Sequence, residues 1–173
     1  MSAEGTLDTS IDDVLTLSQE LTEGDGLIKG QIRLYDVDSD ADTLESDARR
    51  FFDRTLLTGG LEDSLKRLRD TLKGEDNNRL HEMYGPYGTG KSHQMVALYH
   101  CFQSPDVVGN WADGRIEGLN EALPEDALPI VVSLQKEQYD YLWEPLFEKL
   151  NYDINQEDYD DEGGYPPIDI INK

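Results

Sequence analysis

Residues 85–92 constrain this chain more than any other segment, because they follow the spacing G-x-x-x-x-G-K-[ST]. Glycines at 85, 88 and 90 let the backbone curl until successive N–H groups point into a hollow that fits phosphate oxygens. Lys91 would reach the β- and γ-phosphates, the Ser92 hydroxyl would bind Mg²⁺, and both open a predicted helix whose N-terminal dipole favours an anion. The spacing therefore predicts a nucleotide phosphate site made of Gly85, Pro86, Tyr87, Gly88, Thr89, Gly90, Lys91 and Ser92.

The segments on either side fit the strand and helix that such a loop requires. Residues 79–84 have the length of a strand, although His81 and Glu82 make them more polar than a central parallel strand usually is. Residues 90–103 lack proline, repeat apolar residues with helical spacing and end before Pro105. The alternative is an ordinary glycine-rich turn, and the agreement of both flanks favours the phosphate site.

The predicted fold class is α/β: a P-loop NTPase-type parallel sheet flanked by helices. Residues 130–134 form a β-branched run suited to a sheet covered on both faces, and residues 31–37 alternate as a strand does. Two strong strands cannot complete a doubly wound domain. We therefore expect an incomplete sheet, in a chain that is the N-terminal portion of a larger ATPase.

Three regions are expected along the chain. Residues 1–76 form a mostly helical N-terminal extension, 77–152 the partial nucleotide-binding region, and 153–173 an acidic tail that contains proline and glycine. The spacing of apolar residues predicts helices at 11–21, 44–56, 61–72 and 139–150.

A basic cluster in the third of these helices allows two interpretations. Glu62 with Lys66 and Asp63 with Arg67 have the spacing of ion pairs on the exposed side of a helix, and Arg69 follows. The cluster is a possible nucleic-acid contact, yet in so acidic a chain we favour solvated cations paired with nearby carboxylates.

The chain is strongly acidic, with 37 Asp and Glu against 15 Lys and Arg and a formal charge of −22. With 37% hydrophobic residues it should nevertheless fold. Acids spread along the chain indicate adaptation to a high-salt cytoplasm, as in halophilic archaea. The alternative is a DNA-mimicking surface, which would favour one concentrated patch.

Neither a signal peptide nor a membrane span is apparent, so a cytoplasmic protein without a membrane partner is expected. Cys101 is the only cysteine, which excludes an intrachain disulfide, and it is interpreted as a small buried hydrophobe.

The second acidic motif of such an NTPase is missing. A carboxylate is expected at the end of a second hydrophobic strand, where it binds Mg²⁺. Residues 130–134 are followed by Gln135 and Lys136, and Glu137 is only a remote candidate. The catalytic residues are therefore unknown, and we expect this chain alone to bind ATP without appreciable turnover.

Two segments extend the pattern beyond the loop. One is Phe-Phe-Asp-Arg-Thr at 51–55, leading to Gly60, and the other is His-Glu-Met-Tyr-Gly-Pro-Tyr-Gly-Thr-Gly-Lys-Ser-His at 81–93. Together they resemble the large AAA+-like P-loop ATPases of prokaryotic phage-defence islands, including BREX ATPases of the BrxC/PglY type. The resemblance implies ATP and Mg²⁺ as ligands, His93 as a further nucleotide-site residue, and action beside other phage-defence proteins on DNA.

Three functions therefore compete. The chain is the ATP-binding part of a motor or switch ATPase, a nucleotide-sensing module that never hydrolyses, or an acidic interaction protein with a fortuitous glycine-rich loop. Absence of nucleotide binding would favour the third.

The charge balance predicts a salt-dependent fold. Lowering ionic strength from 1 M to 0.1 M lengthens the screening distance from about 3 Å to about 10 Å, which strengthens repulsion among the acids. Thermal unfolding followed by circular dichroism should therefore show a lower Tm in tenth-molar than in molar KCl. Equal melting curves would exclude halophilic adaptation.

Overall fold

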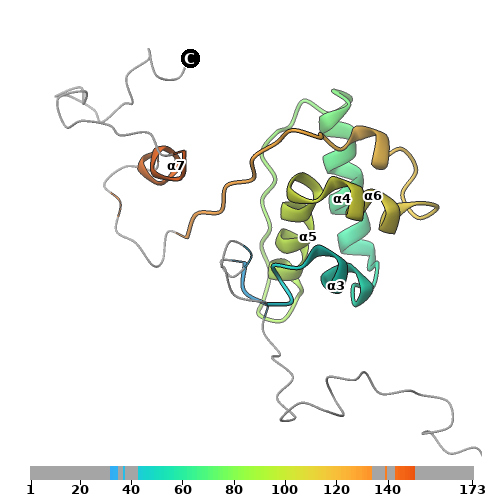
Figure 1. Cartoon of the computed structure of the whole chain (residues 1–173), viewed down its shortest axis with the longest axis horizontal. Helices are drawn as coiled ribbons and strands as arrows, with labels where there is room; N and C mark the ends of the chain where they lie inside the picture. Colours follow the sequence, from blue (N-terminus) through green and yellow to red (C-terminus); the bar gives the residue numbers. More distant parts are fainter. Residues whose placement is uncertain (1–31, 35–36, 38–42, 134–138, 140–142, 151–173) are drawn as a thin grey trace, which may run out of the picture. The chain divides into compact units, whose positions relative to one another are not determined.

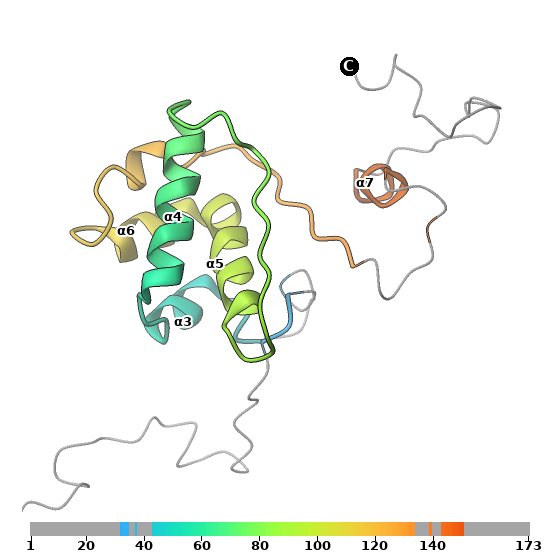
Figure 2. The same cartoon turned by 180° about the vertical axis from the view of Figure 1, so that it is seen from behind.

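Figures 1 and 2 show a computed structural model that describes residues 32–34, 37, 43–133, 139 and 143–150. The chain divides into two units, Met1–Ile32 and Arg33–Lys173, and Ile32 alone is described in the first. The second contains, in order, α3 (Ala48–Asp53), α4 (Gly59–Leu72), α5 (Lys91–Gln103), α6 (Pro105–Ala112), the 3₁₀ turn η2 (Asn120–Ala122) and α7 (Glu144–Lys149).

The predicted α/β sheet is wrong, because the described residues form five α-helices and no β-strand. Residues 79–84 and 130–133 run as irregular extended chain in Figures 1 and 2. All of 79–84 except Met83 are exposed, which does not suit a central parallel strand. β-Branched residues favour strands through packing on neighbouring strands, and neither segment has a ladder partner within the described residues. The strand predicted at 31–37 is described only at 32–34 and 37, which are not in a strand.

Helix α3 is shorter than the helix predicted at 44–56. Its N-cap is Asp47, whose Oδ1 accepts hydrogen bonds from the backbone N–H groups of Arg49 (3.0 Å) and Arg50 (3.1 Å). Phe51 and Phe52 are buried, and their rings meet edge to face at 5.3 Å. This short helix therefore supplies two aromatic rings to the core.

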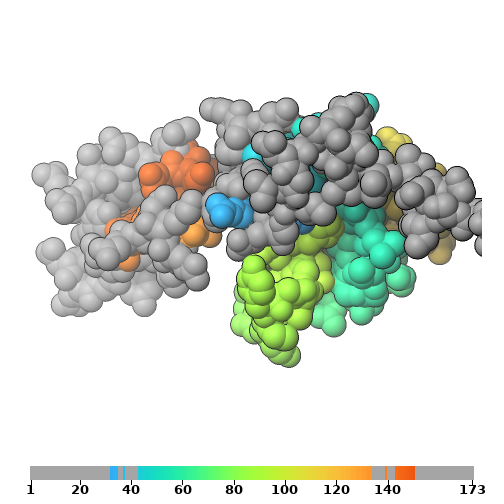
Figure 3. All heavy atoms as spheres, turned by 90° about the horizontal axis from the view of Figure 1, so that it is seen from below, coloured from blue at the N-terminus to red at the C-terminus, as the bar shows by residue number. Residues whose placement is uncertain are grey.

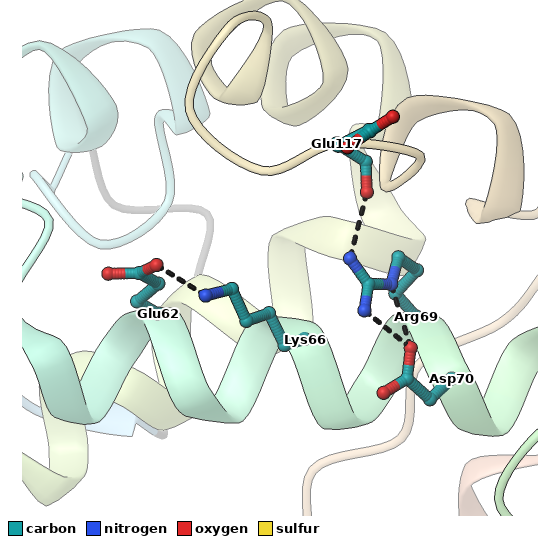
Figure 4. Close-up of polar contacts among 5 residues, drawn as sticks. All are labelled: Glu62, Lys66, Arg69, Asp70 and Glu117. Atoms are coloured by element: carbon teal, nitrogen blue, oxygen red, sulfur yellow. Dashed lines mark hydrogen bonds and ion pairs between the residues drawn. The ribbon is translucent and has the colours of Figure 1, made fainter.

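Helix α4 confirms the helix predicted at 61–72. Thr58 caps its N-terminus by accepting a hydrogen bond from the Leu61 N–H at 3.4 Å, and Leu61 and Leu65 are buried. Figure 4 shows two ion pairs of this helix, in which Lys66 pairs with Glu62 at 2.5 Å and Arg69 pairs with Asp70 at 2.7 Å. The expected pairing of cations with nearby carboxylates thus holds for Lys66 and Arg69.

Helix α5 confirms the predicted helix after the loop, but it has two apolar faces. The face towards the core buries Val96, Ala97, His100 and Cys101. The apolar residues that gave 90–103 its helical spacing, at 95, 98, 99 and 102, instead line an open groove of about 520 Å³, together with residues of the extended segments. Because both faces are apolar, helical spacing alone did not identify which one is buried.

Sequence reasoning missed helix α6. Pro105 marks the point after which α5 cannot continue, and in the structure it is also the first residue of α6. Proline suits the first position of a helix, where its missing N–H costs nothing. A side chain at Gly109 would collide with Asn120, so glycine permits α6 and η2 to pack closely. Leu119 is the N-cap residue of η2, and its side chain is fully buried.

His100 lies among these helices with 1% of its surface exposed. Its ring centroid is 5.7 Å from that of Phe51 and 6.2 Å from that of Phe52. Nε2 lies 2.8 Å from the Glu45 carbonyl oxygen, so this nitrogen carries the proton, and Nδ1 is buried without a partner in the described part of the chain. Burial lowers the pKa of His100, while the Glu45 carbonyl and Asp47 act in the opposite direction with less effect.

Helix α7 is shorter than the helix predicted at 139–150, because it begins only at Glu144, with Pro145 in its first turn. The rings of Trp143 and Phe147 meet edge to face at 5.6 Å. The helix predicted at 11–21 and the acidic tail predicted at 153–173 both lie outside the described residues. Among the described helices, none is long and apolar enough to cross a membrane.

The lowered pKa of His100 predicts that acid destabilises the fold. Between the folded pKa and the ordinary value of 6.5 the unfolded chain binds more protons, so stability is complete above about pH 6.5 and decreases as pH falls below it. The free energy of unfolding, measured with urea in molar KCl, should fall between about pH 7 and about pH 5.5.

A His100→Gln variant tests this origin, because glutamine keeps a donor for the Glu45 carbonyl but does not titrate. Its unfolding free energy should vary less steeply over the same pH range. An unchanged slope would assign the acid sensitivity to other groups.

Candidate nucleotide-binding site

The loop at 85–92 has the backbone conformation that its glycines suggest. Gly85, Gly88 and Gly90 have φ values of 150°, 84° and 80°, in the region that side chains disfavour. Gly90 is the N-cap of α5, and no side chain caps the first N–H groups of that helix. The loop therefore leads into an uncapped helix N-terminus, which favours an anion.

Lys91 folds back across the loop. Its Nζ donates hydrogen bonds to the carbonyl oxygens of Gly85 (2.9 Å) and Pro86 (2.7 Å) and lies 3.3 Å from Thr89 Oγ1. The Thr89 hydroxyl in turn donates to the Pro86 carbonyl at 3.0 Å. Among the described residues no carboxylate pairs with Lys91, so its ammonium group contacts only uncharged oxygens.

His93 anchors the start of α5 to α3. Its ring stacks on Phe51 with centroids 4.5 Å apart, and its Nε2 lies 3.0 Å from Thr55 Oγ1. Since the Thr55 hydroxyl donates its proton to the Phe51 carbonyl at 2.7 Å, it accepts from His93, whose Nε2 must carry a hydrogen. Burial lowers the pKa of His93, which favours the neutral form of the ring.

The remaining predicted site residues lie at the surface. Pro86, Gly88 and Ser92 are exposed, and the rings of Tyr84 and Tyr87 are 92% and 87% exposed. Glu137, the remote candidate for a catalytic acid, lies outside the described residues. The structure thus places Lys91 Nζ against the backbone of its own loop, whereas the His93 ring packs on Phe51 of α3.

Helix α4 forms a second wall beside the loop, which sequence reasoning missed. A cavity of about 290 Å³ is lined by Gly60, Asp63, Ser64, Arg67, Glu82, Met83, Tyr84, Thr89, Lys91 and Gln94. In Figure 3 the chain around the loop and the start of α5 (yellow-green) lies directly beside α4 (turquoise). The sequence contained a signal for this wall, because one face of α4 carries Gly60, Asp63, Ser64 and Arg67 at the spacing i, i+3, i+4 and i+7.

Cys101 is confirmed as a buried hydrophobe. Its side chain is fully buried, and burial raises the pKa of the thiol to about 12. A thiol with this pKa stays protonated near neutral pH and is therefore a poor nucleophile.

Residues 28–138, which include α3 to α6 and the loop, match the family described as the DUF499 N-terminal domain. Because the match covers most of the chain, the protein belongs to this family. No curated protein and no solved structure matches the chain. The family match does not extend to the phage-defence ATPases, so that resemblance stays a prediction.

The hydrogen bond between Thr55 and His93 predicts that Thr55→Val destabilises the protein. The substitution keeps the shape but leaves the His93 N–H without its acceptor, at a cost of about 1–3 kcal/mol, while the Phe51 carbonyl keeps only its bond from the Arg54 N–H at 3.2 Å. Urea unfolding should detect this loss, and hydrogen exchange should be faster in residues 85–95. The control is Thr71→Val, whose hydroxyl lies 3.4 Å from both the Asn78 carbonyl oxygen and His81 Nε2 at the exposed surface, and this substitution should cost under about 0.5 kcal/mol. Equal stability of the two variants would contradict the role of Thr55.

Proposed function

We propose that the loop at 85–92 binds the phosphates of a nucleoside triphosphate. The observation that supports this most directly is the position of Lys91, whose ammonium contacts the loop's own carbonyl oxygens. These bonds already have a charged donor, and a phosphate oxygen would add the attraction of an opposite charge that a carbonyl oxygen lacks. A phosphate would therefore replace the carbonyl contacts with a gain in electrostatic energy.

The remaining features of the loop fit the same ligand. Gly88 and Gly90 have no atoms within 4 Å of the place where a side chain would begin, so the backbone is open to a bound group. Ser92 is exposed in the first turn of α5. Its hydroxyl fits Mg²⁺, which prefers oxygen ligands and keeps several waters, so one protein oxygen is a reasonable share of its ligands. When bound, Mg²⁺ would neutralise charge on the phosphates.

Binding, rather than hydrolysis, is the activity that these residues support. Phosphoryl transfer requires an in-line water and groups that stabilise the charge of the transition state. Of the described residues, the loop, Lys91 and Ser92 account for contacts to the phosphates and Mg²⁺, and none of these is proposed to position the in-line water. A nucleotide-sensing module that does not hydrolyse therefore stays open beside the ATP-binding part of an ATPase.

The choice of ATP, and partnership with DNA and with other phage-defence proteins, rests only on the resemblance of residues 51–55 and 81–93. We propose them as the setting of the site, with no contact of the described residues in their support. Nucleotide binding does not depend on them, since it is argued from the loop itself.

The proposal predicts that Lys91→Ala weakens MgATP binding. Losing a charged hydrogen-bond donor costs about 1.5–3 kcal/mol, which corresponds to an increase in Kd of about tenfold or more. Isothermal calorimetry at molar KCl measures the change, with circular dichroism to verify that each variant is folded.

Lys66→Ala is the matched control, because it removes a lysine that pairs with Glu62 outside the cavity. Its affinity for MgATP should equal that of the unchanged chain. Equal affinity of the Lys91→Ala variant, or no binding by the unchanged chain, would contradict the proposal.

A further inference from the structure

One face of helix α4 points towards the loop. Gly60, Asp63, Ser64 and Arg67 share this face and line the cavity of about 290 Å³ together with Lys91. Cavity residues therefore come from two helices that lie far apart in the sequence. Any group held by the loop on this side would meet side chains of α4.

Two side chains fix α4 against the first turn of α5. Ser64 Oγ lies 3.1 Å from Gln94 Oε1 and 2.9 Å from the Gly60 carbonyl oxygen. The amide of Gln94 packs on Gly60, where a Cβ would approach its Nε2 to 3.1 Å. Since Arg67 is one turn beyond Ser64, this contact holds its backbone beside the helix that begins with Lys91.

Arg67 differs from its basic neighbours. Figure 4 shows Lys66 paired with Glu62, and Arg69 bonded to both Asp70 and the Glu117 carbonyl oxygen at 2.9 Å. Within the described residues Arg67 forms no ion pair, not even with Asp63 one turn before it, although the sequence predicted that pair. The side chain is exposed and lines the cavity.

We propose that Arg67 binds the terminal phosphate of the nucleotide whose inner phosphates the loop holds, so that the site prefers a triphosphate to a diphosphate. This inference rests on the proposed function. A guanidinium presents a planar fork of donors that matches two phosphate oxygens at once, whereas Lys91 acts as a point charge. The two cations therefore have different roles, one on each wall of the cavity.

The acids of the cavity add a requirement for a metal. Asp63 and Glu82 line the same space as Lys91 and Arg67, so the four formal charges cancel. A free triphosphate gains little from a neutral cavity, while the magnesium complex brings its own positive charge. The preference for a triphosphate should therefore be expressed with MgATP and MgADP.

The test compares Kd values for MgADP and the magnesium complex of the β,γ-imido analogue of ATP, using the full chain and calorimetry at molar KCl. Arg67→Ala should weaken the triphosphate about tenfold or more and leave MgADP unchanged, because one charged, bidentate contact is lost. Arg67→Lys should keep part of the affinity, and Arg67→Glu should lose more than alanine. Arg49→Ala, which removes an exposed arginine of α3 outside the cavity, is the control and should change neither Kd.

The outcomes separate this inference from the proposed function. If Arg67→Ala leaves both Kd values unchanged, or weakens both ligands equally, while Lys91→Ala still weakens binding, the inference on Arg67 fails and the phosphate loop stands. If the unchanged chain binds neither nucleotide, the proposed function itself fails. Because Arg67 is exposed, its variants should stay folded, and circular dichroism melts of each variant test this.

Discussion

The contact between Thr55 and His93 is the constraint on which the position of the loop depends. The Thr55 hydroxyl donates to the Phe51 carbonyl and accepts from His93, so one side chain connects the end of α3 with the first turn of α5. Stacking of His93 on Phe51 adds an apolar contact at the same place. The residues that carry Lys91 are thereby attached to a buried core, although the loop itself is exposed.

The loop was predictable from sequence because its determinants are local. The glycines at 85, 88 and 90 adopt left-handed conformations within six residues, and the helix that follows begins where the motif requires. The sheet was not predictable in the same way, since a strand depends on partners far along the chain. The run at 130–133 has strand composition but no ladder in the described residues, so composition alone gave the wrong fold class.

The second wall of the site was missed for a related reason. Asp63 and Arg67 have the spacing of a helix ion pair, and such exposed pairs contribute only about 0.3–0.5 kcal/mol. A preference this weak is easily overridden by the surroundings, and the structure turns both residues towards the cavity beside Lys91. The contact of Ser64 with Gln94, which joins positions 30 residues apart, places this face of α4 beside the first turn of α5.

Within the described residues Arg67 and Lys91 line the cavity without carboxylate partners, which suits the proposed binding of phosphate. An exposed ion pair is worth little, so leaving Arg67 and Lys91 without carboxylate partners costs the fold under about 1 kcal/mol each. Repulsion between 37 acids and an incoming phosphate acts over the screening distance, which shrinks to about 3 Å at molar salt. Direct contacts of the length that Lys91 now makes, 2.7 and 2.9 Å, survive that screening better than the long-range repulsion does. High salt therefore allows an acidic protein to bind an anion through a few well-placed donors.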